Sequence, residues 1–268
     1  MGLLGKKISE TYKSLLRIDD NSNGIDTSLE SVTDGAGNKS SVKLSDDQFR
    51  IQPQNDDTTS LFDVRTKGGG SLLTVDSSNS IVKAGVGQFN VLTQYAYFGC
   101  GNAVTSGNAA GYHYPLYFGT GFGPSGVAAG DQVNHFGNSA DPATTFTTAD
   151  ATDQKANDLV PYMMYVPDNI YIDSVTSMEG ADAATGDTTR FHLMSYALTS
   201  GSTSCLTDGT LIAHSNDVTN AGSEQIYKSA WTIDSANVAS TRVLVCTFEA
   251  DGNNSDYSYQ TIIKYHIV

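Results

Sequence analysis

The chain is poor in cysteine, tryptophan, lysine and glutamate, and it contains no long apolar run. Three cysteines, one tryptophan and five histidines occur among its 268 residues. No apolar stretch reaches about 18 residues, the minimum for a helix that crosses a membrane. The scarcity of Lys and Glu disfavours long helices. Glycine, serine, threonine, asparagine and aspartate are abundant instead, a composition typical of β-sheets joined by many turns.

Cysteine usage excludes the common cysteine-based frameworks. Cys100, Cys205 and Cys246 are scattered, form no CxxC pair and have no histidine at zinc-ligand spacing. Their odd number also disfavours a disulfide framework. We interpret all three as small buried hydrophobic residues.

The charge balance excludes another class of partner. The formal net charge is −14, and residues 100–268 carry five basic against seventeen acidic side chains. An anionic surface without a Lys/Arg stripe repels phosphate backbones, so we expect no nucleic-acid binding. Such a surface favours solubility and lateral repulsion between exposed particles.

The first residues predict neither lipidation nor secretion. Residues 1–5 resemble the start of a myristoylation site, but Lys6 occupies the position that requires Ser or Thr. Lys6, Lys7 and Glu10 also interrupt the apolar run that a signal peptide needs. We therefore expect synthesis in a cytoplasm and no membrane insertion.

Residues 1–20 contain the only net-basic segment, and its apolar residues recur at helical spacing. These residues are Leu4, Ile8, Tyr12 and Leu15. They predict an amphipathic helix of about four turns, stopped by the polar run from Asp19 to Gly24. A helix this short needs a groove or its own copies for stability, so we interpret it as a docking helix. A helix that caps the protein's own stalk is the alternative.

Residues 21–87 alternate short apolar β-type clusters with glycine-bearing turns. The clearest clusters are 61–66, 72–75 and 81–86, and Gly68–Gly70 permits a sharp reversal between the first two. No cluster is long enough to build its own core, whereas symmetric copies can cover each other's apolar faces. We predict a thin, intertwined trimeric β shaft; a few ordinary hairpins of a monomeric domain are the alternative. The core candidates of the trimer are Leu61, Val64, Leu73, Val75 and Ile81.

Residues 88–111 are interpreted as a neck, and residues 112–268 as one β-sandwich. Eight or nine strands are expected in the sandwich, separated by turn residues at the intervals found in jelly rolls. They lie near 112–118, 133–136, 159–166, 170–178, 189–198, 210–214, 225–233, 241–250 and 259–267. The predicted class is all-β, with a short N-terminal helix, a thin intertwined β shaft and a C-terminal jelly-roll-like β-sandwich knob.

Several stretches of the first 90 residues resemble a known family. They are Thr11–Leu16, Asn21–Asp26, Asp34–Asn38, Leu44–Asp47, Leu73–Asp76 and Asn79–Val82. They resemble the N-terminal region and shaft of tailed-phage virion proteins of the fibre and appendage type. More loosely, Gly111–Pro115 and Ile263–His266 resemble the β-sandwich knob of such proteins. The resemblance implies a trimeric appendage whose N-terminal end docks on the virion, and it leaves open whether the knob sits on the tail or on the capsid.

The sequence shows no constellation typical of catalysis or cofactor binding. Gly119–Gly123 lacks the helix and the Lys–Ser/Thr of a phosphate loop, and no GxSxG elbow occurs. A serine and an aspartate could meet His192, but ordinary polar positions explain the five histidines better. The acidic residues are mostly turn aspartates without EF-hand spacing, so calcium on a three-fold axis has no support. We predict no catalytic, cofactor-binding or metal-binding residue, and no enzyme.

Tyrosine offers one candidate binding chemistry, because its ring stacks on sugars and supplies rigid contact area. The candidates by residue type are Tyr112, Tyr114, Tyr117, Tyr257 and Tyr259. The favoured alternative is that these side chains alternate into the core or into the trimer seam.

The resulting hypothesis is a non-enzymatic structural protein of a tailed-phage virion, made in the host cytoplasm and assembled as a homotrimeric tail fibre or receptor-binding appendage. Its partners would be other virion proteins, through the N-terminal end, and host cell-surface glycan, through the knob. A capsid-decorating head fibre is one alternative. A small tailspike polysaccharide hydrolase is the second, although tailspike grooves usually need a larger β-helix than residues 112–268 provide.

Overall fold

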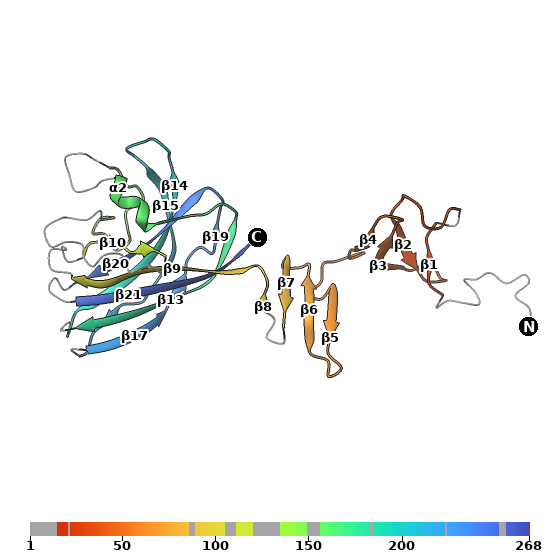
Figure 1. The fold of residues 1–268 in the computed structure, drawn as a ribbon, viewed down its shortest axis with the longest axis horizontal. Helices are drawn as coiled ribbons and strands as arrows, with labels where there is room; N and C mark the ends of the chain where they lie inside the picture. Colours follow the sequence, from red (N-terminus) through yellow and green to blue (C-terminus); the bar gives the residue numbers. More distant parts are fainter. Residues whose placement is uncertain are drawn as a thin grey trace, which may run out of the picture. The chain divides into compact units, whose positions relative to one another are not determined.

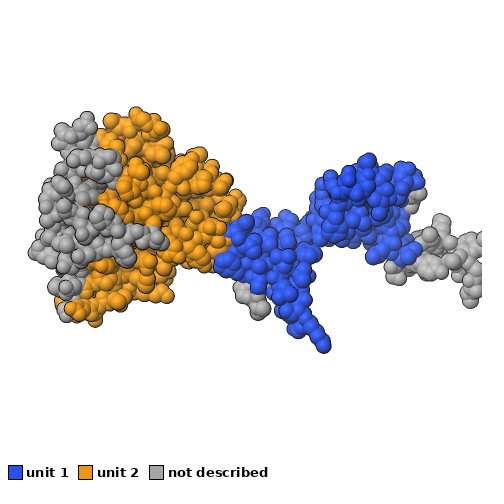
Figure 2. Space-filling model, viewed as in Figure 1, with its two compact units in different colours: residues 1–92 blue, residues 93–268 orange. Residues whose placement is uncertain are grey.

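The computed structural model shows an almost entirely β-stranded chain, which confirms the predicted all-β class (Figure 1). The chain divides into two compact units, residues 1–92 (unit 1) and residues 93–268 (unit 2) (Figure 2). The sheets of both units are built from antiparallel strand pairs. The structure describes residues 15–20, 22–85, 89–104, 111–119, 135–148, 156–182, 185–222, 224–251 and 256–268.

Unit 1 contains two four-stranded sheets in which successive strands pair with each other. The first sheet consists of β1 (Arg17–Ile18), β2 (Glu30–Thr33), β3 (Lys39–Leu44) and β4 (Phe49–Ile51). The second consists of β5 (Phe62–Arg65), β6 (Ser71–Asp76), β7 (Ile81–Ala84) and β8 (Phe89–Asn90). β5, β6 and β7 coincide with the three short clusters that the sequence predicts as strands.

The turn between β5 and β6 shows why this segment needs glycine. Gly69 adopts φ +88°, a conformation that is costly for residues with a Cβ atom. Its N–H donates to the Thr66 carbonyl at 3.0 Å, and the Thr66 N–H donates to the Gly70 carbonyl at 2.8 Å. The three consecutive glycines therefore close a tight hairpin, as the sequence predicts.

The predicted docking helix is only partly described. The positions outside the described residues are Leu4, Ile8 and Tyr12. Leu15 has no helical backbone and is 49% exposed. The prediction is wrong for the end of the segment, because β1 lies there and pairs with β2. An isolated short helix is marginal in water, so ladder hydrogen bonds to β2 outweigh its propensity.

Unit 2 consists of two larger sheets. The seven-stranded sheet has the order β10 (Tyr114–Pro115), β20 (Arg242–Ala250), β14 (Thr188–Leu198), β15 (Leu206–His214) and β18 (Thr232–Ile233), with β12 (Met163–Tyr165) beside β20 and β16 (Val218–Thr219) beside β14. The six-stranded sheet has the order β11 (Tyr117–Phe118), β9 (Thr93–Val104), β21 (Asp256–Ile267), β13 (Ile170–Asp182) and β17 (Glu224–Ala230), with β19 (Asn237–Val238) beside β13. Most of these strands match the expected ones within a few residues.

The two sheets of unit 2 pack face to face and bury one continuous core. The ring of Tyr259 in β21 lies 5.1 Å from that of Phe191 in β14 and 4.7 Å from that of Phe248 in β20. The Trp231 indole N–H donates a 2.9 Å hydrogen bond to the Ser177 hydroxyl. Side-chain alternation along each strand places these aromatic residues on the inner faces.

A second core covers the outer face of the seven-stranded sheet. Residues 135–148 and a short helical segment, α2 (Ala156–Leu159) and η1 (Val160–Tyr162), pack on this face. Phe136 lies against Phe146 and against Tyr196, whose hydroxyl donates to the Ala143 carbonyl at 2.8 Å. The strand expected over 159–166 therefore begins only at Met163, because its first residues are helical.

Strand β9 differs from the predicted neck at residues 88–111. It pairs with β21 along its length, and Phe98 is completely buried. A Cβ atom at Gly99 would lie 2.8 Å from the Tyr259 carbonyl oxygen. At this position glycine thus permits close approach to β21 instead of marking a flexible neck. The boundary between the two units falls between Leu92 and Thr93.

We expect Gly209→Ala to destabilise unit 2, because the new Cβ atom would lie 2.6 Å from Thr144 Cα and 2.7 Å from the Tyr196 ring. Overpacking of this kind costs about 1–3 kcal/mol. Gly180→Ala is the matched control, since a Cβ atom there meets none of the described atoms within 4 Å. Urea unfolding measures both variants. Equal stability would contradict the close packing of residues 135–148 on β15.

Candidate functional site

The sheet formed by β5 to β8 has one entirely apolar face. The register pairs Val64 with Leu73 and Leu73 with Ala84, and cross-strand partners share a face. The full face consists of Phe62, Val64, Leu73, Val75, Val82, Ala84 and Phe89. All seven side chains remain at least partly exposed, with Phe62 at 38% and Phe89 at 47%.

The opposite face of this sheet is polar and largely satisfied within the chain. Asp76 is buried there and accepts hydrogen bonds from the Asn79 amide at 2.9 Å and the Lys83 ammonium at 3.1 Å. Both bonds hold the pKa of Asp76 below its usual range, with the Asn79 amide contributing most. The apolar face therefore holds most of the sheet's exposed hydrophobic side chains, although Leu72 and Ile81 lie outside it.

The sheet formed by β1 to β4 repeats this organisation. Its register places most of its apolar side chains on one face, interrupted by Glu30. They are Ile18, Val32, Val42, Leu44, Phe49 and Ile51. Phe49 is 66% exposed. Among the described residues of unit 1, no Val, Leu, Ile or Phe side chain is buried, so this unit lacks a hydrophobic core within one chain.

The structure brings together three of the five predicted trimer-core residues. Val64, Leu73 and Val75 lie on the apolar face of the β5–β8 sheet. Ile81 pairs with Asp76 and so belongs to the polar face. Leu61 precedes β5 and is joined to β6 by its N–H, which donates to the Val75 carbonyl. Period-2 alternation counted from Val75 would have placed Ile81 on the apolar face, because it ignores the turn at residues 77–80 that resets the register.

Most of the tyrosines considered for sugar stacking are core residues. Tyr114, Tyr257 and Tyr259 are buried in the core between the sheets. Tyr112 and Tyr117 are half-buried and pack against the two cores. The alternative interpretation, inward alternation, is therefore the correct one for the three buried rings.

An apolar hollow lies on the six-stranded sheet, with a volume of about 310 Å³. Its lining includes Tyr97, Met178, Ile226, Ser258 and Gln260. Ile226 is 83% exposed, which is unusual for so large an apolar side chain. The hollow thus combines an aromatic ring and apolar surface with a few hydrogen-bonding groups, a lining typical of small-ligand sites.

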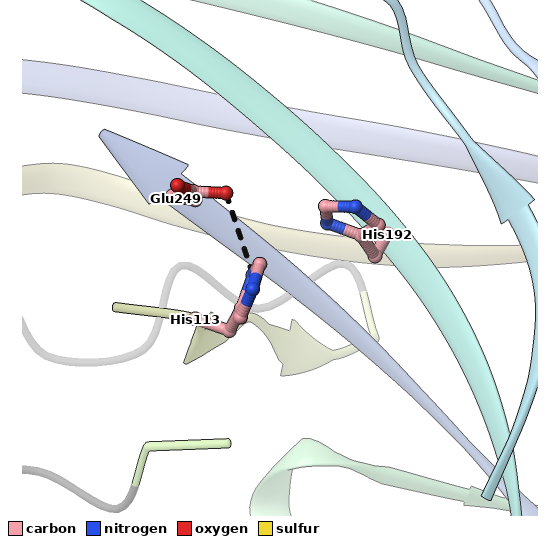
Figure 3. Close-up of side chains that lie close together, drawn as sticks. All are labelled: His113, His192 and Glu249. Carbon is pink, nitrogen blue, oxygen red and sulfur yellow. Dashed lines mark ion pairs between the residues drawn. The ribbon is translucent and has the colours of Figure 1, made fainter. Parts of the chain in front are cut away.

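Three titratable side chains meet under the second core, on the outer face of the seven-stranded sheet (Figure 3). His113 comes from the segment before β10, His192 from β14 and Glu249 from β20. One potential ligand atom of each lies within 4.8 Å of the others. The two imidazole rings meet edge to face with centroids 4.9 Å apart. We call these residues the histidine cluster.

Burial leaves the histidine cluster with unpaired polar atoms. His113 and His192 are buried. Among the described residues, no hydrogen-bond partner is found for His113 Nδ1, His192 Nδ1, Glu249 Oε2 or the neighbouring Thr247 Oγ1. Burial, reinforced by His113 and Arg190, lowers the pKa of His192 to about 3. His192 is therefore neutral at physiological pH.

Sequence reasoning missed this cluster, because it treated the histidines as ordinary polar residues. The three residues are far apart in the chain and follow no ligand-spacing motif. Only the pairing of β14 with β20, and the position of the segment that carries His113, bring them together.

Comparisons with known proteins do not identify a family for this chain, so its function has to be inferred from the structure. No protein-family model matches the chain, and no curated protein has a significantly similar sequence. Within the described residues, no helix has both the length and the apolar character needed to cross a membrane.

A buried carboxyl group makes the stability of unit 2 depend on pH. Glu179 in β13 is buried between the sheets, and its Oε2 accepts a 2.5 Å hydrogen bond from the Thr189 hydroxyl. No partner of its Oε1 is found in the described part of the chain. Burial raises the pKa of Glu179 from 4.5 to about 7. Between these values the folded state binds more protons than the unfolded state, so the contribution of Glu179 to stability falls as pH rises.

We expect Glu179→Gln to be more stable than the unchanged protein at pH 8 and nearly equal to it at pH 4. The gap should open by up to about 1.4 kcal/mol per pH unit between 4.5 and 7. Unfolding free energies of the two proteins across this range measure the gap. The opposite pH dependence of His192 cancels in the difference, because both proteins carry it. Parallel stability curves would contradict the burial of an ionisable Glu179.

Proposed function

We propose that the chain is a non-enzymatic structural protein of a tailed-phage virion, assembled as a homotrimeric tail fibre or receptor-binding appendage. One observation carries the proposal: both sheets of unit 1 present an apolar face whose side chains all remain at least partly exposed in the described part of the chain. The resemblance of residues 11–82 to the docking region and shaft of such fibres supports the same assignment.

The apolar faces favour assembly from copies of this chain. Burial of apolar surface stabilises by about 25 cal/mol per Å², and the face of the β5–β8 sheet contains two phenylalanines and three valines. Three copies around an axis each direct one such face inward and keep the polar face, with Asp76 and Lys83, outward. Each thin sheet then gains a core that it does not build alone.

The strand order of unit 2 supports a jelly-roll knob. One sheet has the order β9, β21, β13, β17, and the other has β10, β20, β14, β15. Among these eight strands, the chain changes sheets at every step in chain order except one. β14 and β15 are consecutive strands that stay in one sheet. This strand order matches the one expected of two Greek keys folded into a double-sheet jelly roll, which supports the proposed knob.

The knob is the part of the protein that we assign to host contact. The apolar hollow offers the Tyr97 ring beside the polar side chains of Ser258 and Gln260, which suits the apolar face and hydroxyl groups of a sugar. A shallow site of this kind binds weakly, and three copies in one trimer raise the total affinity through avidity. Cell-surface glycan is therefore the proposed ligand.

A matched pair of substitutions tests the assembly. Leu73→Lys places a charge on the apolar face, whereas Leu72→Lys places the same charge at the neighbouring residue, which has no partner in β5 at the register shift and is 46% exposed. We expect Leu73→Lys to dissociate or misfold the trimer, because one buried charge appears per copy. Leu72→Lys should remain trimeric. Light scattering after size-exclusion chromatography measures the mass of each.

Two outcomes of the same measurement would overturn the assembly proposal. The first is a folded monomer of the unchanged protein at micromolar concentration. The second is a trimer that tolerates Leu73→Lys as well as it tolerates Leu72→Lys. Either result would show that the apolar face of the β5–β8 sheet does not hold the copies together.

Location and adsorption test the biological assignment. We expect labelled antibodies against unit 2 to decorate phage tails, and the purified protein to compete with phage for adsorption to host cells. Labels on the capsid, without competition, would instead support the head-fibre alternative. Release of reducing sugar ends from host polysaccharide would overturn the non-enzymatic assignment in favour of a tailspike hydrolase.

A further inference from the structure

We propose that His113, His192 and Glu249 bind a divalent transition-metal ion of the zinc type and that this ion fastens unit 2. The observation behind the proposal is a cluster of buried polar atoms for which the described residues supply no hydrogen-bond partner. Buried polar groups are nearly always paired, so several orphans at one place require an explanation. The inference does not depend on the proposed function, because it concerns unit 2 alone.

The hydrogen bond of His113 leaves the correct nitrogen free for a metal. His113 Nε2 lies 2.7 Å from the Ser139 carbonyl oxygen, which can only accept, so Nε2 carries the proton. The lone pair is then on Nδ1, which lies 3.8 Å from Glu249 Oε2. Metal-binding histidines typically donate their other N–H to a carbonyl or a carboxylate in this way.

His192 has a looser arrangement, because its contact with a carboxylate is longer than a hydrogen bond. Its Nε2 lies 3.7 Å from Asp141 Oδ1, and no partner of its Nδ1 is found among the described residues. A carboxylate behind the ring is a common outer partner of a metal-bound imidazole.

The surrounding charges permit a cation. Glu249 contributes a carboxylate whose Oε2 is buried, and Asp141 lies beside His192. A fixed positive charge, Arg190, faces the same side of the sheet as Glu249, its partner in β20. Arg190 is already paired with Asp217, at 2.5 Å, so its charge is offset.

The donor set selects the type of ion. Two imidazoles and one carboxylate suit zinc and its neighbours, whereas calcium and magnesium require mostly oxygen ligands. Ligand atoms around a tetrahedral zinc ion lie about 3.3 Å apart, given bonds of about 2.0 Å. The cluster, spaced at up to 4.8 Å, must therefore contract slightly on binding, through small side-chain rotations.

A path for the ion exists beside His192. A cavity of about 650 Å³ is lined by Asp141, His192, His214 and Ser215 and opens to solvent. It brings solvent to the His192 ring, from which an ion would approach the cluster, although its lining includes neither His113 nor Glu249. Bound there, the ion would join β14, β20 and the segment before β10, which lie far apart in the chain.

The experiment uses the full-length protein after treatment with EDTA, titrated with zinc chloride in a calorimeter. We expect one zinc ion per chain and a rise in melting temperature with zinc concentration, because the ion binds the folded state. Glu249→Gln keeps the side-chain shape but removes the charge, and it should weaken binding roughly tenfold or more. His266→Ala, in a histidine of β21 that contacts Asp173, is the control for binding to ordinary surface histidines.

A spectroscopic measurement keeps the proposal testable if a variant fails to fold. Cobalt added to the unchanged protein should produce visible absorption bands typical of nitrogen and oxygen ligands, and zinc should abolish them by displacement. The proposal is overturned by the absence of zinc binding and of cobalt bands in the unchanged protein. It is equally overturned if folded Glu249→Gln binds zinc as tightly as His266→Ala does.

Discussion

The fold of unit 2 depends on covering both faces of its seven-stranded sheet. Phe191 and Leu193 of β14 face the six-stranded sheet, whereas Met194 and Tyr196 face the segment of residues 135–148. Because side chains alternate along a strand, a strand covered on both sides needs buried residues at almost every position, as β14 has. The double cover also removes water from the polar residues of the sheet, and the histidine cluster is a consequence.

Burial acts on the titratable groups of unit 2 in opposite directions according to their charge. It raises the pKa of Glu179 to about 7 and lowers that of His192 to about 3, because in each case it disfavours the charged form. Glu179 keeps one hydrogen bond, to Thr189, whereas Glu249 and His192 lie where a cation can satisfy them. A buried polar group can thus be satisfied either by a neighbouring side chain, as Glu179 is by Thr189, or by a bound ion, as we propose for Glu249 and His192.

Unit 1 shows the opposite arrangement, because none of its described Val, Leu, Ile or Phe side chains is buried. On the polar face of the β5–β8 sheet, Asp76 is hydrogen-bonded to Asn79 and Lys83. These polar groups therefore already have partners within the chain. On the apolar face, by contrast, the side chains remain at least partly exposed to solvent. A sheet with one satisfied and one unsatisfied face is suited to assembly, and this difference is the physical basis of the proposed trimer.

Local patterns in the sequence determined the all-β class, the positions of most strands and the hairpin at Gly69, because alternation and turn residues act over a few residues. The same alternation placed Val64, Leu73 and Val75 on one face. Only the tertiary structure decided that Ile81 faces the other way, that β9 belongs to the body instead of a neck, and that His113 meets His192 and Glu249. These features depend on strand register and sheet order between distant residues, where a shift of one residue reverses every side chain.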